Sequence, residues 1–483
     1  QGHLAGQATS LPARQLQALA ARALSQARTH GAFHWELAFP EVFVDAAGRP
    51  RPDAGFDAVL GNPPWEMLRA DTGDSERRSE SRGQVRARLA FARGSAQYPL
   101  LPRGHINQYQ LFITRALDLL RPGGRFGLIL PSGLQTDVGS ADLRRALLDS
   151  CQLNTWLAFD NRTAIFPIHR SVRFLLVGGA RGGRTDTLPI QARLTDASAL
   201  AALPDDPRTE AHPSEIRLTR EFLSRWDSAH LTMPALASPL DVSVAWRALQ
   251  APPLASPTGW SVCFGRELNA TDDRAHFVPY RASSGVAAAA LLPVVDGRHL
   301  RPFGVDLSLV TRGIRGEDAS RLLAAASSFG RARLAYRDVA GATNRLTLIA
   351  AVLPAGVVST HTVFCAKQPL LDRDAWCLVG LLNSLVVNFL VRLQMSTHVT
   401  AALMARLPVP RPTAGSSEWA GLADLATALS VRRDPEDDLG RYARLNALAS
   451  RLYHLTADEH AHVVSSFPLL SDSARSRCVE AYR

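Results

Sequence analysis

The chain has 483 residues, of which 46% are hydrophobic and 20% charged, enough for about two to four domains of ordinary globular composition. No apolar run reaches the roughly 18 residues of a membrane span and no signal peptide is evident, so we expect no membrane partner. Lys367 is the only lysine, and a GC-rich genome explains this bias towards arginine as well as phosphate binding does. The net charge of +10 itself still favours a polyanionic partner. Five scattered cysteines predict neither a metal site nor disulfides, and they favour a reducing cytoplasm.

The first hundred residues alternate between helical and extended patterns. Residues 11–29 have helical periodicity, and the aromatic stretch Phe33–Phe43 has a strand-like pattern. The apolar run Phe56–Leu60 predicts a short strand that leads directly into Gly61–Trp65, with the sequence Gly-Asn-Pro-Pro-Trp. The polar, arginine-rich residues 69–97 predict a long mobile loop or an exposed helix.

Alternating helices and strands are predicted after this loop, over residues 106–120 (helix), 125–130 (strand), 141–151 (helix), 155–159 (strand) and 172–178 (strand). Arg121–Gly124, which reads Arg-Pro-Gly-Gly, is the expected stop of the first of these helices. Gly178–Gly183 is glycine-rich and is expected to be a flexible exit turn. The order β-α-β-α-β-β predicts an α/β sheet.

The second half of the chain has a different character. Residues 233–258 are rich in Pro, Ala and Ser and predict a linker. Residues 261–410 contain many short strand-like runs and predict a second globular region of mixed α/β type. Residues 416–483 are expected to be mainly helical.

Asn62-Pro63-Pro64-Trp65 has residue types that suit chemistry on an exocyclic amine of a base. Such an amine is a poor nucleophile because its lone pair is delocalised into the ring. The Asn62 side-chain oxygen and the Pro63 carbonyl can accept its two protons, and the prolines stiffen the loop beforehand. Trp65 offers an aromatic face to an extruded base. The alternative is an ordinary Asn-Pro-Pro turn with a buried Trp, but the preceding apolar strand favours function.

The stretch Phe56–Trp65 resembles the catalytic motif of N6-adenine DNA methyltransferases. Further segments resemble Type IIG restriction–modification enzymes and related phage-defence methylases, namely Phe33–Phe43, Gln108–Phe112, Leu119–Gly124 and Leu128–Ser132. The resemblance implies the C-terminal half of a Rossmann-like methyltransferase sheet. It also implies methyl transfer from S-adenosylmethionine to a flipped adenine in double-stranded DNA, with Asn62, Pro63, Pro64 and Trp65 as catalytic residues.

Phe166 lies in Ile165-Phe-Pro167, which resembles a later motif of the same family. The resemblance implies that Phe166 stacks on the flipped adenine, which would then lie between Trp65 and Phe166. The alternative is a core phenylalanine before a strand, which is the commoner fate of this residue type.

The family binds S-adenosylmethionine mainly through a Gly-rich strand-turn and an acidic residue ahead of the Asn-Pro-Pro loop. Neither is found before Phe56, which leaves Asn62 as the cofactor-binding candidate of this chain. Because the first residue is Gln1 rather than Met, we expect a missing N-terminal region or a complementing chain. We find no convincing Asp…Glu-x-Lys nuclease pattern.

Six segments between residues 261 and 410 resemble Type IIG target-recognition regions: Phe264–Arg274, Pro293–Leu300, Tyr336–Asp338, Thr343–Arg345, Leu381–Ser384 and His398–Thr400. Arg, Asn, Thr and His side chains can reach base edges and phosphates. The candidates for DNA contact are Arg266, Asn269, Arg274, Arg337, Asn344 and His398. At each position the alternative is a solvated loop or capping residue, and His398 is alternatively a core histidine.

The sequence therefore predicts a partial methyltransferase domain over residues 1–185, a connector over 186–260, a target-recognition domain over 261–410 and a helical segment over 411–483. The predicted function is site-specific adenine-N6 methylation of DNA in a restriction–modification or phage-defence system. The alternative is a DNA-binding specificity fragment that does no chemistry by itself and needs a partner chain.

Overall fold

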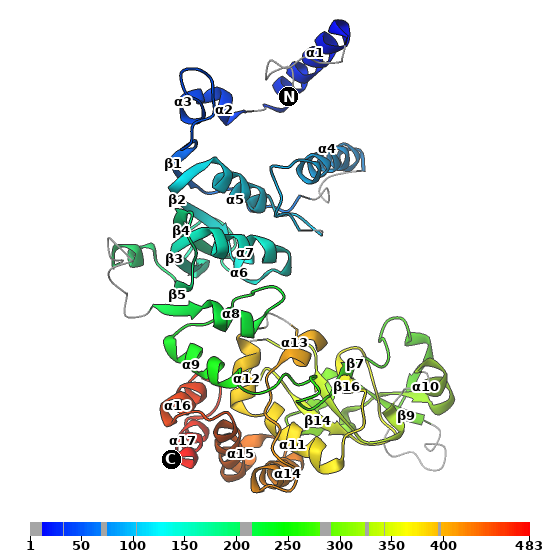
Figure 1. Ribbon diagram of the computed structural model, residues 1–483. Coiled ribbons are helices and arrows are strands. Elements are labelled where there is room, and N and C mark those ends of the chain that lie inside the picture. The colour runs from blue at the N-terminus through cyan, green and yellow to red at the C-terminus, as the bar shows by residue number, and fades with distance from the viewer. Residues whose placement is uncertain are drawn as a thin grey trace. The chain divides into compact units, whose positions relative to one another are not determined.

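The structure is a computed structural model that describes residues 12–31, 33–68, 75–102, 104–202, 215–280, 291–323, 328–341, 343–394 and 398–483. It divides into two compact units, Gln1–Leu188 and Pro189–Arg483 (Figure 1). The boundary lies close to residue 185, where the predicted catalytic portion ends.

Unit 1 is built on a mixed sheet. Its strands are β1 (Phe56–Gly61), β2 (Leu120–Pro131), β3 (Cys151–Asp160) and β4 (Arg173–Arg181). Their spatial order is β1-β2-β4-β3. β1 runs parallel to β2, whereas β4 is antiparallel to both of its neighbours. The predicted α/β class is confirmed.

The longer helices of unit 1 are α1 (Ala13–His30), α4 (Ser75–Gly94), α5 (Gln108–Leu119) and α7 (Ala141–Ser150), with a short α6 (Gly133–Thr136). α5 packs on β2 and α7 packs on β3. Both bury an apolar face, as Ile113 and Leu147 illustrate. Of the two alternatives for residues 69–97, the helix is correct over α4, while residues 69–74 lie outside the described residues.

The aromatic stretch Phe33–Phe43 is not a strand, so that prediction is wrong. It forms two short helices, α2 (Trp35–Ala38) and α3 (Pro40–Phe43), and Pro40 occupies the first turn of α3, where its missing N–H costs nothing. Trp35, Phe39 and Phe43 each meet Phe56 edge to face, with centroids 5.5, 5.5 and 5.6 Å away. Aromatic packing around β1 therefore outweighs the strand-like pattern.

Several glycines of unit 1 lie inside the strands of the sheet rather than in turns. A Cβ on Gly124 would lie 2.8 Å from the Phe56 carbonyl oxygen, so only glycine allows β1 to approach β2 here. The Arg-Pro-Gly-Gly stretch thus follows the end of α5, as expected, but lies inside β2. Gly178 and Gly179 lie inside β4, which corrects the expected exit turn; the turn comes at Gly182 and Gly183.

β5 (Thr187–Leu194) spans the boundary, and β6 (Ile216–Thr219), α8 (Arg220–Trp226) and α9 (Pro239–Ala248) follow it. α9 lies inside the Pro/Ala/Ser-rich stretch 233–258, which is therefore not a simple linker. The Ser238 side chain accepts a hydrogen bond from the Asp241 N–H at 3.3 Å, and Pro239 begins the helix. Val244 and Ala245 are fully buried. The Ser, Pro and Ala residues of this stretch therefore include the cap, the first turn and the buried face of a helix.

Unit 2 contains two four-stranded sheets and a two-stranded ribbon. The first sheet has the order β14 (Ala350–Leu353), β13 (Arg333–Arg337), β16 (Val363–Ala366) and β7 (Phe264–Gly265). The second has the order β15 (Val358–Ser359), β9 (Leu291–Val295), β12 (Arg312–Arg315) and β8 (Phe277–Pro279). The ribbon pairs β10 (Leu300–Arg301) with β11 (Gly304–Val305). The mixed α/β prediction for this region is confirmed.

After α8 and α9, the helices described in unit 2 are α10 (Gly316–Leu322), α11 (Asp372–Leu382), α12 (Leu385–Arg392), α13 (Ala401–Arg406), α14 (Ser417–Ser430), α15 (Leu439–Leu452), α16 (Ala457–Ser465) and α17 (Asp472–Tyr482). The predicted helical C-terminal segment is confirmed by α14 to α17 (Figure 1). The finer division of unit 2 into connector, recognition and closing parts stays a prediction.

In the described ranges no single helix has the length and apolar character needed to cross a membrane. α11 and α12 pass that test only as a pair, with a 60° bend between them. Most of their residues are buried inside unit 2.

Candidate functional site

The Asn-Pro-Pro-Trp loop starts at the C-terminal end of β1, after Gly61. Its far end is anchored ahead of α5, where the Leu68 N–H donates to the Ile106 carbonyl at 2.9 Å. Pro63 is buried, whereas the residues on either side of it are exposed. The loop is therefore held at both ends and stiffened by proline, and Asn62 remains accessible.

Trp65 is fixed by polar and aromatic contacts at once. Its indole Nε1–H donates to the Ile129 carbonyl of β2 at 3.3 Å. Its ring stacks on Phe174 with centroids 6.0 Å apart and an interplanar angle of 27°. The centroid of the Phe166 ring lies 6.1 Å from that of Trp65, with an interplanar angle of 83°. These contacts make Trp65 half-buried and restrict its orientation.

Phe166 lies in the connection between β3 and β4, which a buried asparagine organises. The Asn161 Oδ1 accepts from the Phe166 N–H at 2.9 Å, and its Nδ2 donates to the carbonyls of Phe166 and Ile168 at 3.1 and 3.3 Å. The Phe166 ring also packs edge to face on Phe174 at 4.9 Å. Sequence reasoning missed Asn161, whose only signal is an amide directly after an apolar strand.

The structure therefore brings Trp65 and Phe166 together from distant parts of the chain. The two rings meet edge to face rather than as parallel walls. Both are half-buried, so each keeps an accessible surface. Insertion of a base between two parallel faces requires one ring to turn, and the stacking roles stay a prediction.

In unit 2, two of the predicted DNA contacts, Arg266 and His398, lie beside one carboxylate. Asp338 is 4% exposed and follows β13. Its Oδ2 lies 3.3 Å from the Arg266 Nη2, and its Oδ1 lies 3.4 Å from the His398 Nδ1. Arg337 is its neighbour in sequence, and its buried Nε has no hydrogen-bond partner. Burial lowers the pKa of Arg337 below its usual value.

The remaining candidates lie outside this cluster. The Asn269 side-chain oxygen accepts from the Thr271 N–H at 3.0 Å, as in a local turn cap. Asn344 is exposed on a loop after Gly341. Arg274 is exposed and, within the described ranges, makes no hydrogen bond or ion pair through its side chain. Their DNA-contacting role stays a prediction.

One of the family-like segments, Leu381–Ser384, does not present its polar side chains to a ligand. Asn383 and Ser384 are fully buried. The Asn383 amide bonds the backbone of Ala350 through both its oxygen and its nitrogen, at 3.1 and 2.8 Å. The Ser384 hydroxyl caps α12, and the Thr400 hydroxyl caps α13. These residues stabilise unit 2, so the proposed reach of Leu381–Ser384 to DNA is wrong.

For the residues that the structure covers, no group of three or more His, Cys, Asp or Glu side chains is placed to hold a metal ion. The chemistry available at the Asn-Pro-Pro-Trp loop is hydrogen-bond acceptance by Asn62 and the loop carbonyls, beside an aromatic surface. Such a loop can orient and polarise an amine.

Part of the chain matches a known protein family. The model of the family described as Eco57I restriction-modification methylase matches residues 8–166. No curated protein matches the chain.

Solved structures also resemble the chain. The Type IIL restriction-modification enzyme MmeI, in complex with DNA, is 11% identical over 88% of this chain and 56% of that one, with a TM-score of 0.44. The type IIG restriction endonuclease BpuSI is 12% identical over 88% and 55%, with a TM-score of 0.33. The Type ISP enzyme LlaGI, as a nuclease-deletion mutant, is 11% identical over 78% and 35%, with a TM-score of 0.40.

The chain spans about half the length of the first two of these structures. The family match itself covers β1, the Asn-Pro-Pro-Trp loop, α5, β2, β3 and Phe166. Over residues 8–166 the chain is therefore similar to the Eco57I restriction-modification methylase family.

Proposed function

We propose that this chain supplies the catalytic loop and the DNA-recognition part of an S-adenosylmethionine-dependent DNA methyltransferase that modifies adenine at N6. Its biological setting is a restriction–modification or phage-defence system. The observation that carries the proposal is the accessible Asn62 at the end of β1, beside a Trp65 ring fixed by β2 and by Phe166.

In this proposal the Asn62 side-chain oxygen and the Pro63 carbonyl accept hydrogen bonds from the two N6 protons of adenine. Accepting these protons directs the amine and raises the electron density on nitrogen. S-adenosylmethionine supplies the methyl group when bound. Because the loop is already rigid, the alignment requires no reorganisation at the moment of reaction.

Trp65 and Phe166 would hold the extrahelical adenine by aromatic contact. Base–aromatic stacking contributes roughly 1–3 kcal/mol per base, comparable with the cost of flipping. The Asn161 side chain positions Phe166 for this contact through its hydrogen bonds to the Phe166 backbone.

The proposal includes a second polypeptide segment that completes the cofactor site, either upstream in the same protein or on another chain. Among the described residues, β1 is paired on one edge only. Leu60 on this strand is 82% exposed, and Leu37 on α2 is 79% exposed. Parallel strands are normally buried on both faces, so this edge and its apolar surroundings suit added strands and helices. Of the residues expected to hold the cofactor, this chain provides Asn62.

Unit 2 would bind double-stranded DNA through the surface that carries Arg266, Arg274 and His398. Their exposed cationic and polar side chains suit phosphates and base edges. Arginine contacts to phosphate should make this binding strongly dependent on salt.

The locus that encodes this chain, expressed in a host without adenine methylation, provides the test. Single-molecule sequencing should find N6-methyladenine in one recurring sequence, and Asn62→Ala should reduce it by about 100-fold or more. DNA binding should stay nearly unchanged, because the amide acts in the transition state. Modified cytosine in place of adenine, or full methylation by Asn62→Ala, contradicts the proposal. Binding without any methylation supports the specificity fragment instead.

A further inference from the structure

Arg266 and His398 share one buried carboxylate, although they come from distant parts of the chain. Each oxygen of Asp338 faces one of them, Oδ2 towards Arg266 and Oδ1 towards His398. The side chain of Asp338 is 5% exposed, whereas those of Arg266 and His398 are 53% and 52% exposed. The carboxylate is therefore hidden while the two groups that it orients remain open to a ligand.

The backbone around Asp338 is itself held in place. The Asp338 N–H donates to the Thr362 carbonyl at 3.0 Å, and the Val399 N–H donates to the Asp338 carbonyl at 2.9 Å. Val339 and His398 also form an antiparallel bridge. The segment that carries His398 is thus attached directly to the residue that orients it.

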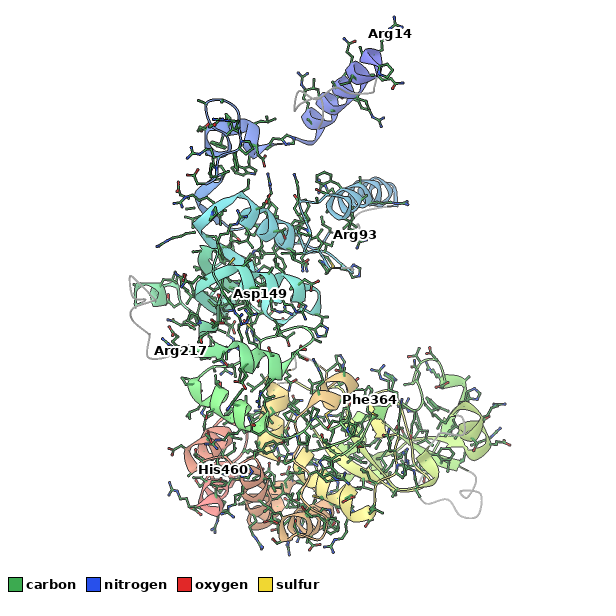
Figure 2. All side chains as sticks on the ribbon, in the orientation of Figure 1. Arg14, Arg93, Asp149, Arg217, Phe364 and His460 are labelled. Atoms are coloured by element: carbon green, nitrogen blue, oxygen red, sulfur yellow. The ribbon has the colours of Figure 1, made fainter. Side chains whose placement is uncertain are left out.

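An aromatic column lies beneath the Arg266 guanidinium. Its Cζ lies 4.9 Å from the centroid of the Phe364 ring on β16, a residue labelled in Figure 2. Phe364 in turn stacks on Tyr336 at 5.3 Å and 6°, and Phe264 meets Tyr336 edge to face at 4.9 Å. Tyr336 is fully buried. Arg266 is consequently held from one side by charge and from another by a rigid ring.

This arrangement distinguishes Arg266 from an arginine that binds phosphate. A guanidinium beside a carboxylate has little net charge left to offer a phosphate, so it gains little from counterion release. Only its Nη2 is used by Asp338 among the described contacts, and the other N–H donors keep their fork geometry. A planar guanidinium that is held in one orientation and largely neutralised by a carboxylate suits two neutral hydrogen-bond acceptors on the edge of a base.

We propose that Arg266 reads a guanine in the major groove through the O6 and N7 acceptors, with Asp338 as the positioning residue that orients both Arg266 and the adjacent His398. The inference rests on the proposed function, because it assigns base recognition to unit 2. It goes further by naming the base and the residue that sets the geometry. Bidentate arginine–guanine pairs are the commonest specific contact of this kind.

Selection from a randomised duplex library by the full 483-residue chain tests the inference. The wild-type chain should select a motif that contains guanine at a defined position. Arg266→Lys keeps the charge but loses the fork, so the preference at that position should fall about 10- to 100-fold. Asp338→Asn should relax the same position, because the guanidinium is no longer oriented. Arg266→Lys should leave the slope of affinity against salt unchanged, because the charge at this position stays the same.

Arg444→Lys is the matched control, since Arg444 is exposed on α15 and is not among the candidates for DNA contact. It should leave every base preference intact. Thermal unfolding of all variants separates loss of recognition from loss of fold. If Asp338→Asn unfolds, Arg266→Lys still tests the inference, because Arg266 is half exposed and its substitution should not unfold the chain. The inference is overturned if Arg266→Lys retains the guanine preference, or if it weakens all sequences equally. A wild-type chain that binds duplexes without base preference overturns this inference alone, whereas one that binds no duplex also overturns the recognition part of the proposed function.

Discussion

The two units differ in how completely they cover their own apolar surface. In unit 2, every residue of α12 except Arg392 is buried, and α11 is buried over most of its length. In unit 1, α2 and α3 contain no buried residue, although Trp35 and Phe43 on these helices, and Phe39 between them, pack on Phe56. Apolar side chains left open around a parallel edge strand indicate a surface that gains stability when covered.

The same contrast extends to charged pairs. Arg333 and Glu267 in unit 2 are 0% and 7% exposed and are joined by two hydrogen bonds of 2.8 and 2.7 Å. Arg121 and Asp57 beside β1 in unit 1 are 42% and 85% exposed. A buried pair cannot lose one member without leaving an uncompensated charge, whereas water replaces an exposed partner easily.

The largest expected effect is therefore in unit 2. Glu267→Ala should lower the free energy of unfolding by about 3–5 kcal/mol. It leaves the buried Arg333 guanidinium without its counter-charge, and it removes the acceptor of the Ser359 N–H and hydroxyl. Asp57→Ala, the exposed counterpart, should change it by about 1 kcal/mol or less. Denaturant unfolding monitored by hydrogen exchange in each unit measures both changes in unfolding free energy. Equal losses for Glu267→Ala and Asp57→Ala would contradict the expected difference between the buried and the exposed pair.

A smaller loss of stability is expected in the connection between β3 and β4 of unit 1, where Asn161 is buried. Asn161→Ala should destabilise the β3–β4 connection by about 1–3 kcal/mol, because the Phe166 N–H and two carbonyls lose their buried partner. Hydrogen exchange of residues 161–172 should accelerate. Asn154→Ala is the control on the same strand, and its effect should be well below this. Unchanged exchange in Asn161→Ala shows that the connection does not depend on the amide.

The aromatic contact is expected to affect function more than stability. In a methylation-competent protein, Phe166→Ala should destabilise the extrahelical base by roughly 1–3 kcal/mol. Lifetimes of 2-aminopurine at the target position should show a smaller extrahelical population, while Phe166→Trp should largely retain it. If Phe166→Ala leaves both this population and turnover unchanged, Phe166 is an ordinary packing residue.

The smallest effect is expected at the open edge of unit 1. Leu60→Ser should change the unfolding free energy of the isolated chain by about 0.5 kcal/mol or less, because Leu60 is 82% exposed. In the completed protein the same substitution should lower the midpoint of thermal unfolding and the methylation rate. Differential scanning calorimetry on the two forms provides the comparison. If Leu60→Ser changes the unfolding midpoint equally in the isolated chain and in the completed protein, no added segment covers the β1 edge.

Much of unit 1 follows from local sequence signals. The run Phe56–Leu60 forms β1 and leads into the loop as predicted, and α5, α7, β3 and β4 lie close to their expected ranges. The stretch Phe33–Phe43 was predicted wrongly, because rings that alternate as in a strand are drawn together around Phe56. The linker expected over 233–258 contains α9, because Ser238 and Pro239 start a helix whose apolar face is buried.

The sequence by itself determined that a strand leads into the Asn-Pro-Pro-Trp loop and that the fold is of mixed α/β class, since periodicity and proline act over a few residues. The tertiary structure decided which polar groups are supports and which are open. Asn161 orients Phe166, Asp338 orients Arg266, and Asn383 is buried against Ala350. The two pairings in unit 2 join residues 72 and 33 positions apart. Hydrogen-bond partners and burial depend on segments that meet only when the chain is folded, so no local pattern reveals them.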